Sequence, residues 1–110
     1  MPINLLAQKK YDRKRRGVQA SLQRLRTCRG WALLSRDQRE LLVDATKECV
    51  RDHIETLMPQ LERNEKLDYD EIAEAAIRTV FGDNIAMFTL TLPNGRKADE
   101  STVEELMEEI

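Results

Sequence analysis

The chain is poor in aromatic residues, cysteine and histidine, and each shortage excludes a class of protein. Only 5% of its 110 residues are aromatic, so the core must be built from Leu, Ile, Val, Ala and Met. One His and two Cys are too few for the four ligands of a structural zinc site. The two Cys do not make a disulfide framework either, and we expect both to be reduced.

Long apolar runs and glycine-rich loops are also missing. No run approaches the roughly 18 apolar residues that span a membrane, and the cluster of Leu5, Leu6 and Ala7 is too short for the core of a signal peptide. The four glycines stand singly, so there is no glycine-rich phosphate loop. We therefore expect a cytoplasmic protein with no membrane partner and no evident small-molecule substrate.

Length and composition favour one small helical domain. The 110 residues are enough to bury a core, and the abundance of Leu, Glu, Arg and Lys favours helices. We predict a mostly α (α+β) fold that forms a single domain over residues 1–110. Its parts are a basic helical arm at 1–29, central helices at 35–81, and a short β-hairpin with an acidic terminal helix at 84–110.

Apolar periodicity predicts that the arm is an amphipathic helix. Its apolar stripe is formed by Tyr11, Val18, Leu22 and Leu25, opposite a basic face. Gly17 is the weak point within this helix, and Gly30 is the expected C-terminal cap.

Two later helices are expected to begin at capping residues. Ser35 and Gln38 have capping-box spacing, and Asp68 and Glu71 have the spacing of an N-cap and the third helical residue. We expect the first of these helices to bend or end at Pro59 and the second to end before a glycine at position 82. The expected buried stripe of the first helix is Val43, Val50, Ile54 and Leu57, with Leu61 as a further candidate.

From Asn84 the apolar period changes from helical to alternating. Apolar residues recur at every second position from 86 to 92, which is typical of a half-buried strand. Asn94-Gly95 favours a tight turn, so we predict a hairpin with a return strand at 96–98. Ser101 and Glu104 then have capping spacing for a terminal helix.

Charge is strongly segregated along the chain. Residues 1–39 carry 11 Lys and Arg against 2 Asp, whereas residues 40–110 carry 7 against 18 acidic residues. A basic half joined to an acidic half indicates contact with a polyanion, with another protein, or between the two halves of the chain itself.

Our leading hypothesis is a non-enzymatic regulatory protein that contacts nucleic acid through its basic helix. Lys and Arg that neutralise phosphates release condensed counterions, and this release drives binding. The sequence does not distinguish DNA from RNA. The predicted contact residues are Lys9, Lys10, Arg13, Lys14, Arg15, Arg16 and Arg24.

The alternative is an inhibitor or adaptor that binds a protein with a basic surface, of a kind that phages or plasmids encode. Its acidic faces would imitate phosphate. Otherwise the apolar stripe of the terminal helix would dock in a groove of the partner. This stripe consists of Val103, Leu106, Met107 and Ile110.

Catalysis and metal binding have little support. Cys49 and His53 stand four residues apart on one helical face, but they lack an orienting third group and an oxyanion hole. Adding Cys28 would give only three metal ligands. We expect no enzyme, no metal and no cofactor, with Cys49 and His53 at the border of the core. Trp31 is expected to fill the core between helices more than to stack on a base.

Overall fold

The computed structural model describes residues 5–61, 65–88 and 99–110, and five α-helices lie in this part of the chain. They are α1 (Leu5–Thr27), α2 (Arg29–Ala32), α3 (Arg36–Leu57), α4 (Tyr69–Asp83) and α5 (Val103–Met107). Short 3-10 helices cover Met58–Gln60, Ile85–Phe88 and Glu100–Thr102. The prediction of a mostly helical protein is confirmed. None of the described helices is long and apolar enough to cross a membrane.

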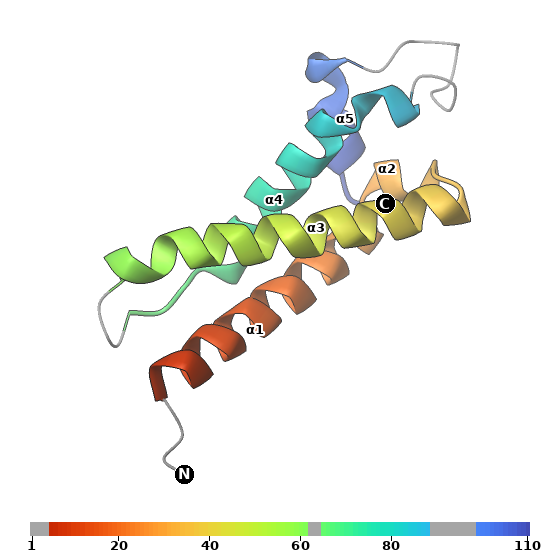
Figure 1. Cartoon of the computed structure of the whole chain (residues 1–110). Coiled ribbons are helices and arrows are strands. Elements are labelled where there is room, and N and C mark those ends of the chain that lie inside the picture. Colours follow the sequence, from red (N-terminus) through yellow and green to blue (C-terminus); the bar gives the residue numbers. More distant parts are fainter. Residues whose placement is uncertain (1–4, 62–64, 89–98) are drawn as a thin grey trace.

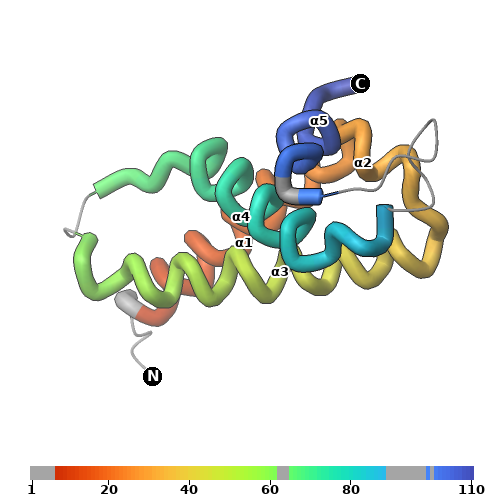
Figure 2. The backbone as a smooth tube through the Cα atoms, turned by 90° about the horizontal axis from the view of Figure 1, so that it is seen from above, coloured from red at the N-terminus to blue at the C-terminus, as the bar shows by residue number. Residues whose placement is uncertain are grey.

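The three long helices form the body of the molecule, and the predicted basic arm is one of them. α1 packs against both α3 and α4 and lies along the lower edge of the view in Figure 1. Seen from above, α1 lies beneath the other two helices (Figure 2). The body is elongated, with extents of 58 × 24 × 21 Å. One long side of α1 therefore faces away from α3 and α4.

Small residues line the buried side of α1. Gly17 and Ser21 are both buried, and the Ser21 hydroxyl donates a hydrogen bond of 2.7 Å to the Gly17 carbonyl oxygen. Val18 and Leu25 are buried, as predicted. Tyr11 is 64% exposed, so its place in the predicted stripe is wrong. The buried side of α1 is thus centred nearer to Gly17 than the predicted stripe was. The small residues there allow α1 to approach α3 closely.

The prediction that Gly30 caps α1 is wrong. α1 ends at Thr27, Cys28 has an extended backbone with φ −74° and ψ 143°, and Gly30 lies buried inside α2. A Cβ atom at Gly30 would lie 3.2 Å from the Phe81 ring and 3.2 Å from both the Cβ and the carbonyl oxygen of Leu106. This glycine therefore allows α2 to pack closely on α4 and α5.

The two predicted capping motifs begin α3 and α4. The Ser35 hydroxyl oxygen accepts from the Gln38 backbone N–H at 3.3 Å, and the Gln38 side chain accepts from the Ser35 N–H at 3.0 Å. At α4, an Asp68 carboxylate oxygen accepts from the Glu71 N–H at 3.1 Å. Each motif satisfies backbone donors that the first turn of a helix leaves without partners.

The buried face of α3 is rotated from the predicted stripe at its N-terminal end. Val50 and Ile54 are buried as predicted, but Leu42 and Thr46 are buried in place of Val43. The Thr46 hydroxyl is satisfied because it donates to the Leu42 carbonyl oxygen at 2.7 Å. α3 ends at Leu57, just before the 3-10 segment that contains Pro59, as predicted. α4 was expected to end before Gly82 but continues one residue past it, to Asp83.

The predicted β-hairpin is not supported in the described part of the chain. Residues 85–88, where the first strand was expected, form a 3-10 helix, and residues 89–98 lie outside the described residues. The turn begins at Asn84, whose carbonyl oxygen accepts from the Met87 N–H at 3.0 Å. Phe88 is fully buried and meets Phe81 edge to face, with ring centroids 5.5 Å apart. Within residues 85–88 the apolar side chains therefore serve to anchor a 3-10 turn to the core.

The predicted cap of the terminal helix is also wrong. Thr102 is the N-cap residue of α5 and makes no side-chain cap bond to the helix. Instead, an Asp99 carboxylate oxygen accepts from the Ser101 N–H at 2.9 Å, and the Asp99 N–H donates to the Thr102 hydroxyl oxygen at 3.1 Å. Side-chain hydrogen bonds therefore order the 3-10 turn that precedes α5. They do not cap α5 itself, contrary to what the spacing of Ser101 and Glu104 had indicated.

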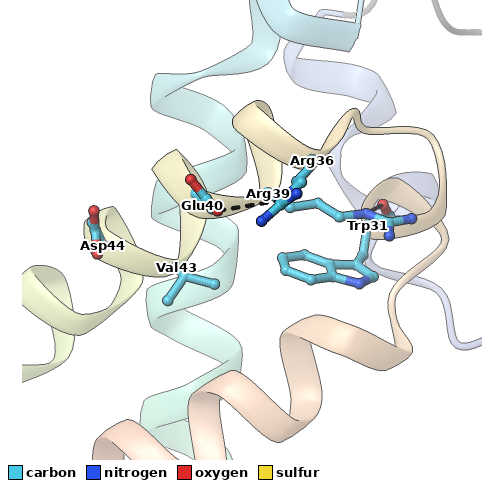
Figure 3. Close-up of a pocket in the computed structure, with 6 residues that line it drawn as sticks. All are labelled: Trp31, Arg36, Arg39, Glu40, Val43 and Asp44. Atoms are coloured by element: carbon cyan, nitrogen blue, oxygen red, sulfur yellow. Dashed lines mark hydrogen bonds and ion pairs between the residues drawn. The ribbon is translucent and has the colours of Figure 1, made fainter.

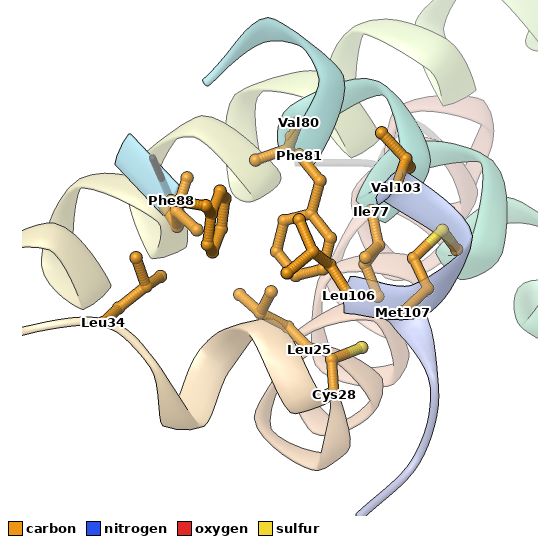
Figure 4. Packing of buried hydrophobic residues seen from close by; sticks show 11 residues of the cluster. Leu25, Cys28, Leu34, Ile77, Val80, Phe81, Phe88, Val103, Leu106 and Met107 are labelled. Carbon is orange, nitrogen blue, oxygen red and sulfur yellow. The ribbon is translucent and has the colours of Figure 1, made fainter. Parts of the chain in front are cut away.

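The main core lies where α5 packs against α2 and α4 (Figure 4). Three residues of the predicted terminal stripe, Val103, Leu106 and Met107, are buried in it. The fourth, Ile110, is 80% exposed. The stripe thus closes the chain's own core. The buried members of the core are Leu25, Cys28, Leu34, Leu42, Ile77, Val80, Phe81, Phe88, Val103, Leu106 and Met107.

The C-terminal residues pair with the junction between α1 and α2. The Arg29 N–H donates to the Glu108 carbonyl oxygen at 2.7 Å, and the Ile110 N–H donates to the Thr27 carbonyl oxygen at 3.0 Å. These two bonds flank a single antiparallel bridge at Cys28. The residues after α5 are therefore held beside the end of the basic helix.

Candidate nucleic-acid interface

Among the described residues, Lys10, Lys14 and Arg24 of the predicted contact set form ion pairs with the acidic half of the chain. Lys10 and Lys14 both bind the carboxylate of Glu55 on α3. Arg24 pairs with Glu109, which follows α5. Part of the charge segregation therefore joins the basic helix to its own protein.

Two lysines bind the single carboxylate of Glu55, and their positive charges favour its ionised form. Hydrogen bonds from Lys10 and Lys14 hold the pKa of Glu55 below its ordinary value. Because one negative charge faces two positive charges, the contact leaves one positive charge on this side of α1.

Arg13 is held by neutral acceptors. One guanidinium nitrogen donates to the backbone carbonyl oxygen of Glu65 at 2.8 Å, and the other lies 3.4 Å from the sulfur of Met58. These contacts tie α1 to the segment before α4 and to the end of α3. Since neither acceptor atom carries a formal charge, they orient the guanidinium without cancelling its charge.

A cleft of about 530 Å³ lies between the N-terminal half of α1 and the segment that leads into α4. We call it the basic cleft, because cations outnumber carboxylates four to two in its lining. Its cations are Lys9, Arg13, Arg16 and Lys66, its carboxylates are Asp12 and Glu65, and its apolar wall is Leu67 and Tyr69. The structure thus brings three predicted residues together with one residue that the sequence did not single out.

Lys66 was missed because it belongs to the acidic half of the chain. It is separated from α1 by the whole of α3, and it reaches the basic cleft only through the packing of α4 on α1. No local pattern around residue 66 indicates this. The sequence signal is confined to α1.

The side of α1 opposite its buried side is exposed and polar. We call the part of it that begins at Arg15 the outer face, and its exposed residues are Arg15, Arg16, Gln19, Gln23 and Arg26. Arg26 stands 11 residues after Arg15, which places both on the same side of the helix. This spacing was the signal in the sequence for Arg26, which the predicted contact set did not include. The single acidic residue of α1 is Asp12.

A second cleft, of about 480 Å³, lies at the start of α3 (Figure 3). Trp31 lines it and is half-buried, so it fills the core only in part. The Arg39 guanidinium carbon lies 5.2 Å from the centroid of the Trp31 ring, and Arg39 Nε donates to the Trp31 carbonyl oxygen at 3.0 Å. The other lining residues are Arg36, Glu40, Val43 and Asp44. Two arginines meet two carboxylates here, so the cleft has no excess charge to attract a polyanion.

The cysteines and the histidine do not gather into a site. Cys28 is buried at the junction of α1 and α2, Cys49 is half-buried on α3, and His53 is exposed, contrary to the expected place of His53 at the core border. Burial raises the pKa of both thiols. Within the described ranges, no group of three or more His, Cys, Asp or Glu is arranged to hold a metal ion.

These observations define a small, mostly helical protein with a basic cleft and a polar helix face. The chain matches none of the family models, curated proteins or solved structures with which it was compared.

Proposed function

We propose that this protein binds nucleic acid through α1 and the basic cleft, as a regulator without catalytic activity. The observation that carries this proposal is the gathering of Lys9, Arg13, Arg16 and Lys66 around one cleft. The ion pairs to Glu55 and Glu109 hold α1 in place and are made by other basic residues, Lys10, Lys14 and Arg24. Excess positive charge at a concave site is the electrostatic condition for attracting a polyanion.

The chemistry of the cleft suits phosphate groups. Arg13 and Arg16 are three residues apart on α1 and so lie on neighbouring turns of the same side. The guanidinium group of Arg16 is exposed and offers a planar fork for bidentate contact with a phosphate. Arg13 is already oriented by the Glu65 carbonyl oxygen, which reduces the entropy lost when a ligand binds. Lys66 adds a point charge from the opposite wall.

Salt-dependent binding tests the proposal. Fluorescence anisotropy of labelled duplex DNA, single-stranded DNA and RNA should show that the protein binds at low salt. Each lost phosphate contact should reduce the slope of log K against log salt by about 0.9 on duplex DNA. We therefore expect a slope reduced by about 2 for the Arg16→Ala/Lys66→Ala variant.

Arg36→Ala is the matched control, because Arg36 is an exposed arginine of α3 that lies outside the basic cleft. It should leave the salt slope unchanged. Wild-type protein that leaves all three nucleic acids unbound at low salt would refute the proposal. An equal loss of affinity in Arg36→Ala and Arg16→Ala would show that net charge alone determines binding. The basic cleft would then not be the binding site.

The alternative function as a protein-binding inhibitor or adaptor has less support. The terminal apolar stripe would need to be exposed, but Val103, Leu106 and Met107 are buried in the chain's own core. The acidic faces remain as the basis of this alternative. A pull-down from lysate distinguishes the two functions, because nuclease treatment should release partners that nucleic acid bridges and should keep proteins that bind directly.

A further inference from the structure

We infer that the outer face of α1 enters the major groove of duplex DNA and reads base pairs there. Arg15, Gln19, Gln23 and Arg26 would face the base edges. This inference rests on the proposed function and narrows its ligand from nucleic acid in general to double-stranded DNA with a preferred sequence.

The four side chains form one row along the exposed side of the helix. They are separated by four, four and three residues, which keeps them on one side of an α-helix. Among the described residues, none forms a hydrogen bond with the amide of Gln19 or Gln23. Both amides are therefore available to a ligand.

The length of the row matches a short stretch of duplex. From Arg15 to Arg26 the helix rises about 16 Å, at about 1.5 Å per residue. Base pairs of B-DNA are spaced about 3.4 Å apart, so the row spans about five base pairs. A binding site of this length is expected from one helix lying in one groove.

The residue types in the row are those that recognise purine edges. A glutamine side chain pairs bidentately with adenine, because its amide N–H donates to N7 while its oxygen accepts from the N6 amino group. An arginine fork donates to O6 and N7 of guanine. The two glutamines lie in the middle of the row, and the two arginines lie at its ends. We therefore expect adenines near the centre of the site and guanines toward its edges.

The packing of α1 presents this row as a ridge. α3 and α4 contact the buried side of α1 and leave the outer face uncovered along the lower edge of the molecule in Figure 1. The major groove of B-DNA is about 12 Å wide and admits an α-helix. The close contact of α1 with α3 at Gly17 fixes the direction in which the ridge points.

Cations flank the ridge on both sides. Arg16 and Lys66 of the basic cleft lie on the α4 side. On the α3 side, Lys47 and Arg51 precede Glu55 by two turns and one turn. Because α1 binds Glu55 through its lysines, this row of α3 faces α1. The two flanks would contact the phosphates that border the groove, while the ridge contacts the bases.

The shape of the ridge disfavours the other nucleic acids. Double-stranded RNA has a deep and narrow major groove that a helix cannot enter. Single-stranded binding commonly uses several aromatic side chains as stacking platforms. The exposed Tyr11 lies one turn before Arg15, but the row from Arg15 to Arg26 itself contains no aromatic residue. Duplex DNA is the nucleic acid whose accessible groove fits a convex helix.

Selection of binding sites from a random duplex library tests the inference. Wild-type protein should enrich a motif of about five base pairs with central adenines. Gln19→Ala and Gln23→Ala should each reduce the ratio of affinities for selected over scrambled duplex by at least about fivefold. Both variants should keep the wild-type affinity for scrambled duplex and its salt slope, because no charge is removed. Gln60→Ala, an exposed glutamine outside α1, is the control and should keep the full preference.

The outcomes separate this inference from the proposed function. Salt-dependent binding to duplex DNA without an enriched motif would overturn the reading of bases and leave the proposed function standing. Tighter binding to RNA or single-stranded DNA than to any selected duplex would overturn the inference in the same way. An equal loss of affinity for selected and scrambled duplex in the glutamine variants would also overturn it. Absence of all binding would remove both proposals.

Discussion

A Cβ atom on Gly17 would lie 2.6 Å from Cδ1 of Ile54, so a hydrogen atom is what fits between α1 and α3 at this point. Cγ1 of Val50 would be only 3.0 Å away. The glycine that interrupts the basic sequence therefore lies where two long helices approach each other closely. Its role is packing, and α1 continues through it without a break.

Substitution at Gly17 should destabilise the protein in proportion to side-chain size. Gly17→Leu should cost about 1–3 kcal/mol, because the new side chain overpacks the contact with Ile54. Gly82→Ala is the control: no atom lies within 4 Å of a Cβ at Gly82, and it should gain about 0.5–1 kcal/mol from helix propensity. Urea denaturation measures both. A Gly17→Leu variant as stable as wild type would contradict the close contact.

Truncation of Leu106 should show that α5 is part of the core. Leu106 is fully buried, so Leu106→Ala should cost about 2–5 kcal/mol and lower Tm by at least about 8 °C. The exposed Ile110 is the control, and Ile110→Ala should change stability by less than about 0.5 kcal/mol. An unchanged Tm for Leu106→Ala would mean that the stripe is free to bind a partner.

Acid should weaken the contact of Glu55 with its two lysines. The pKa of Glu55 is lower in the folded chain than its ordinary value of 4.5, so the folded state favours the ionised carboxylate. This stabilisation is present above pH 4.5 and is lost as the pH falls through the lower, folded-state pKa.

Urea denaturation of Glu55→Gln across this acidic range checks the prediction. The stability difference between wild type and variant should shrink as the pH falls below 4.5. Glu48→Gln changes another exposed carboxyl on α3 and serves as the control. A difference that stays constant with pH would show that the carboxylate does not stabilise the fold through its charge.

The two thiols should resist alkylation at neutral pH. Burial raises the pKa of Cys28 and of Cys49, which lowers the fraction of reactive thiolate. Cys28 is fully buried and Cys49 only partly, so Cys49 should react first with iodoacetamide. Mass spectrometry after timed labelling identifies the order, and denatured protein should label at both positions without delay. Faster labelling of Cys28 in the native protein would contradict its burial.

The starts of α3 and α4 could be predicted because their signals are local. Ser35 and Asp68 cap their helices through residues three positions later, and such contacts depend little on the rest of the fold. Residues 85–88 were predicted as the start of a strand, but Ala86 and Phe88, the two alternating residues in this segment, are equally compatible with a 3-10 turn. The packing of Phe88 on Phe81 decided between them, and that contact depends on tertiary structure.

The same division holds for the candidate site. The basic residues of α1 were predictable because they are neighbours in sequence. The pairing of Lys10 and Lys14 with Glu55 joins residues more than 40 positions apart. The sequence pattern therefore could not reveal which cations form ion pairs within the protein. Lys66 entered the site for the same reason, through the docking of α4.

The elongated body affects how the size of this protein is judged in solution. Its radius of gyration is 15.8 Å, whereas a compact chain of this length has about 13 Å. A rod-like particle migrates through a gel-filtration column ahead of spherical standards of equal mass. A single chain of 12.8 kDa will therefore elute like a heavier protein, and light scattering is needed before an early peak is assigned to a dimer.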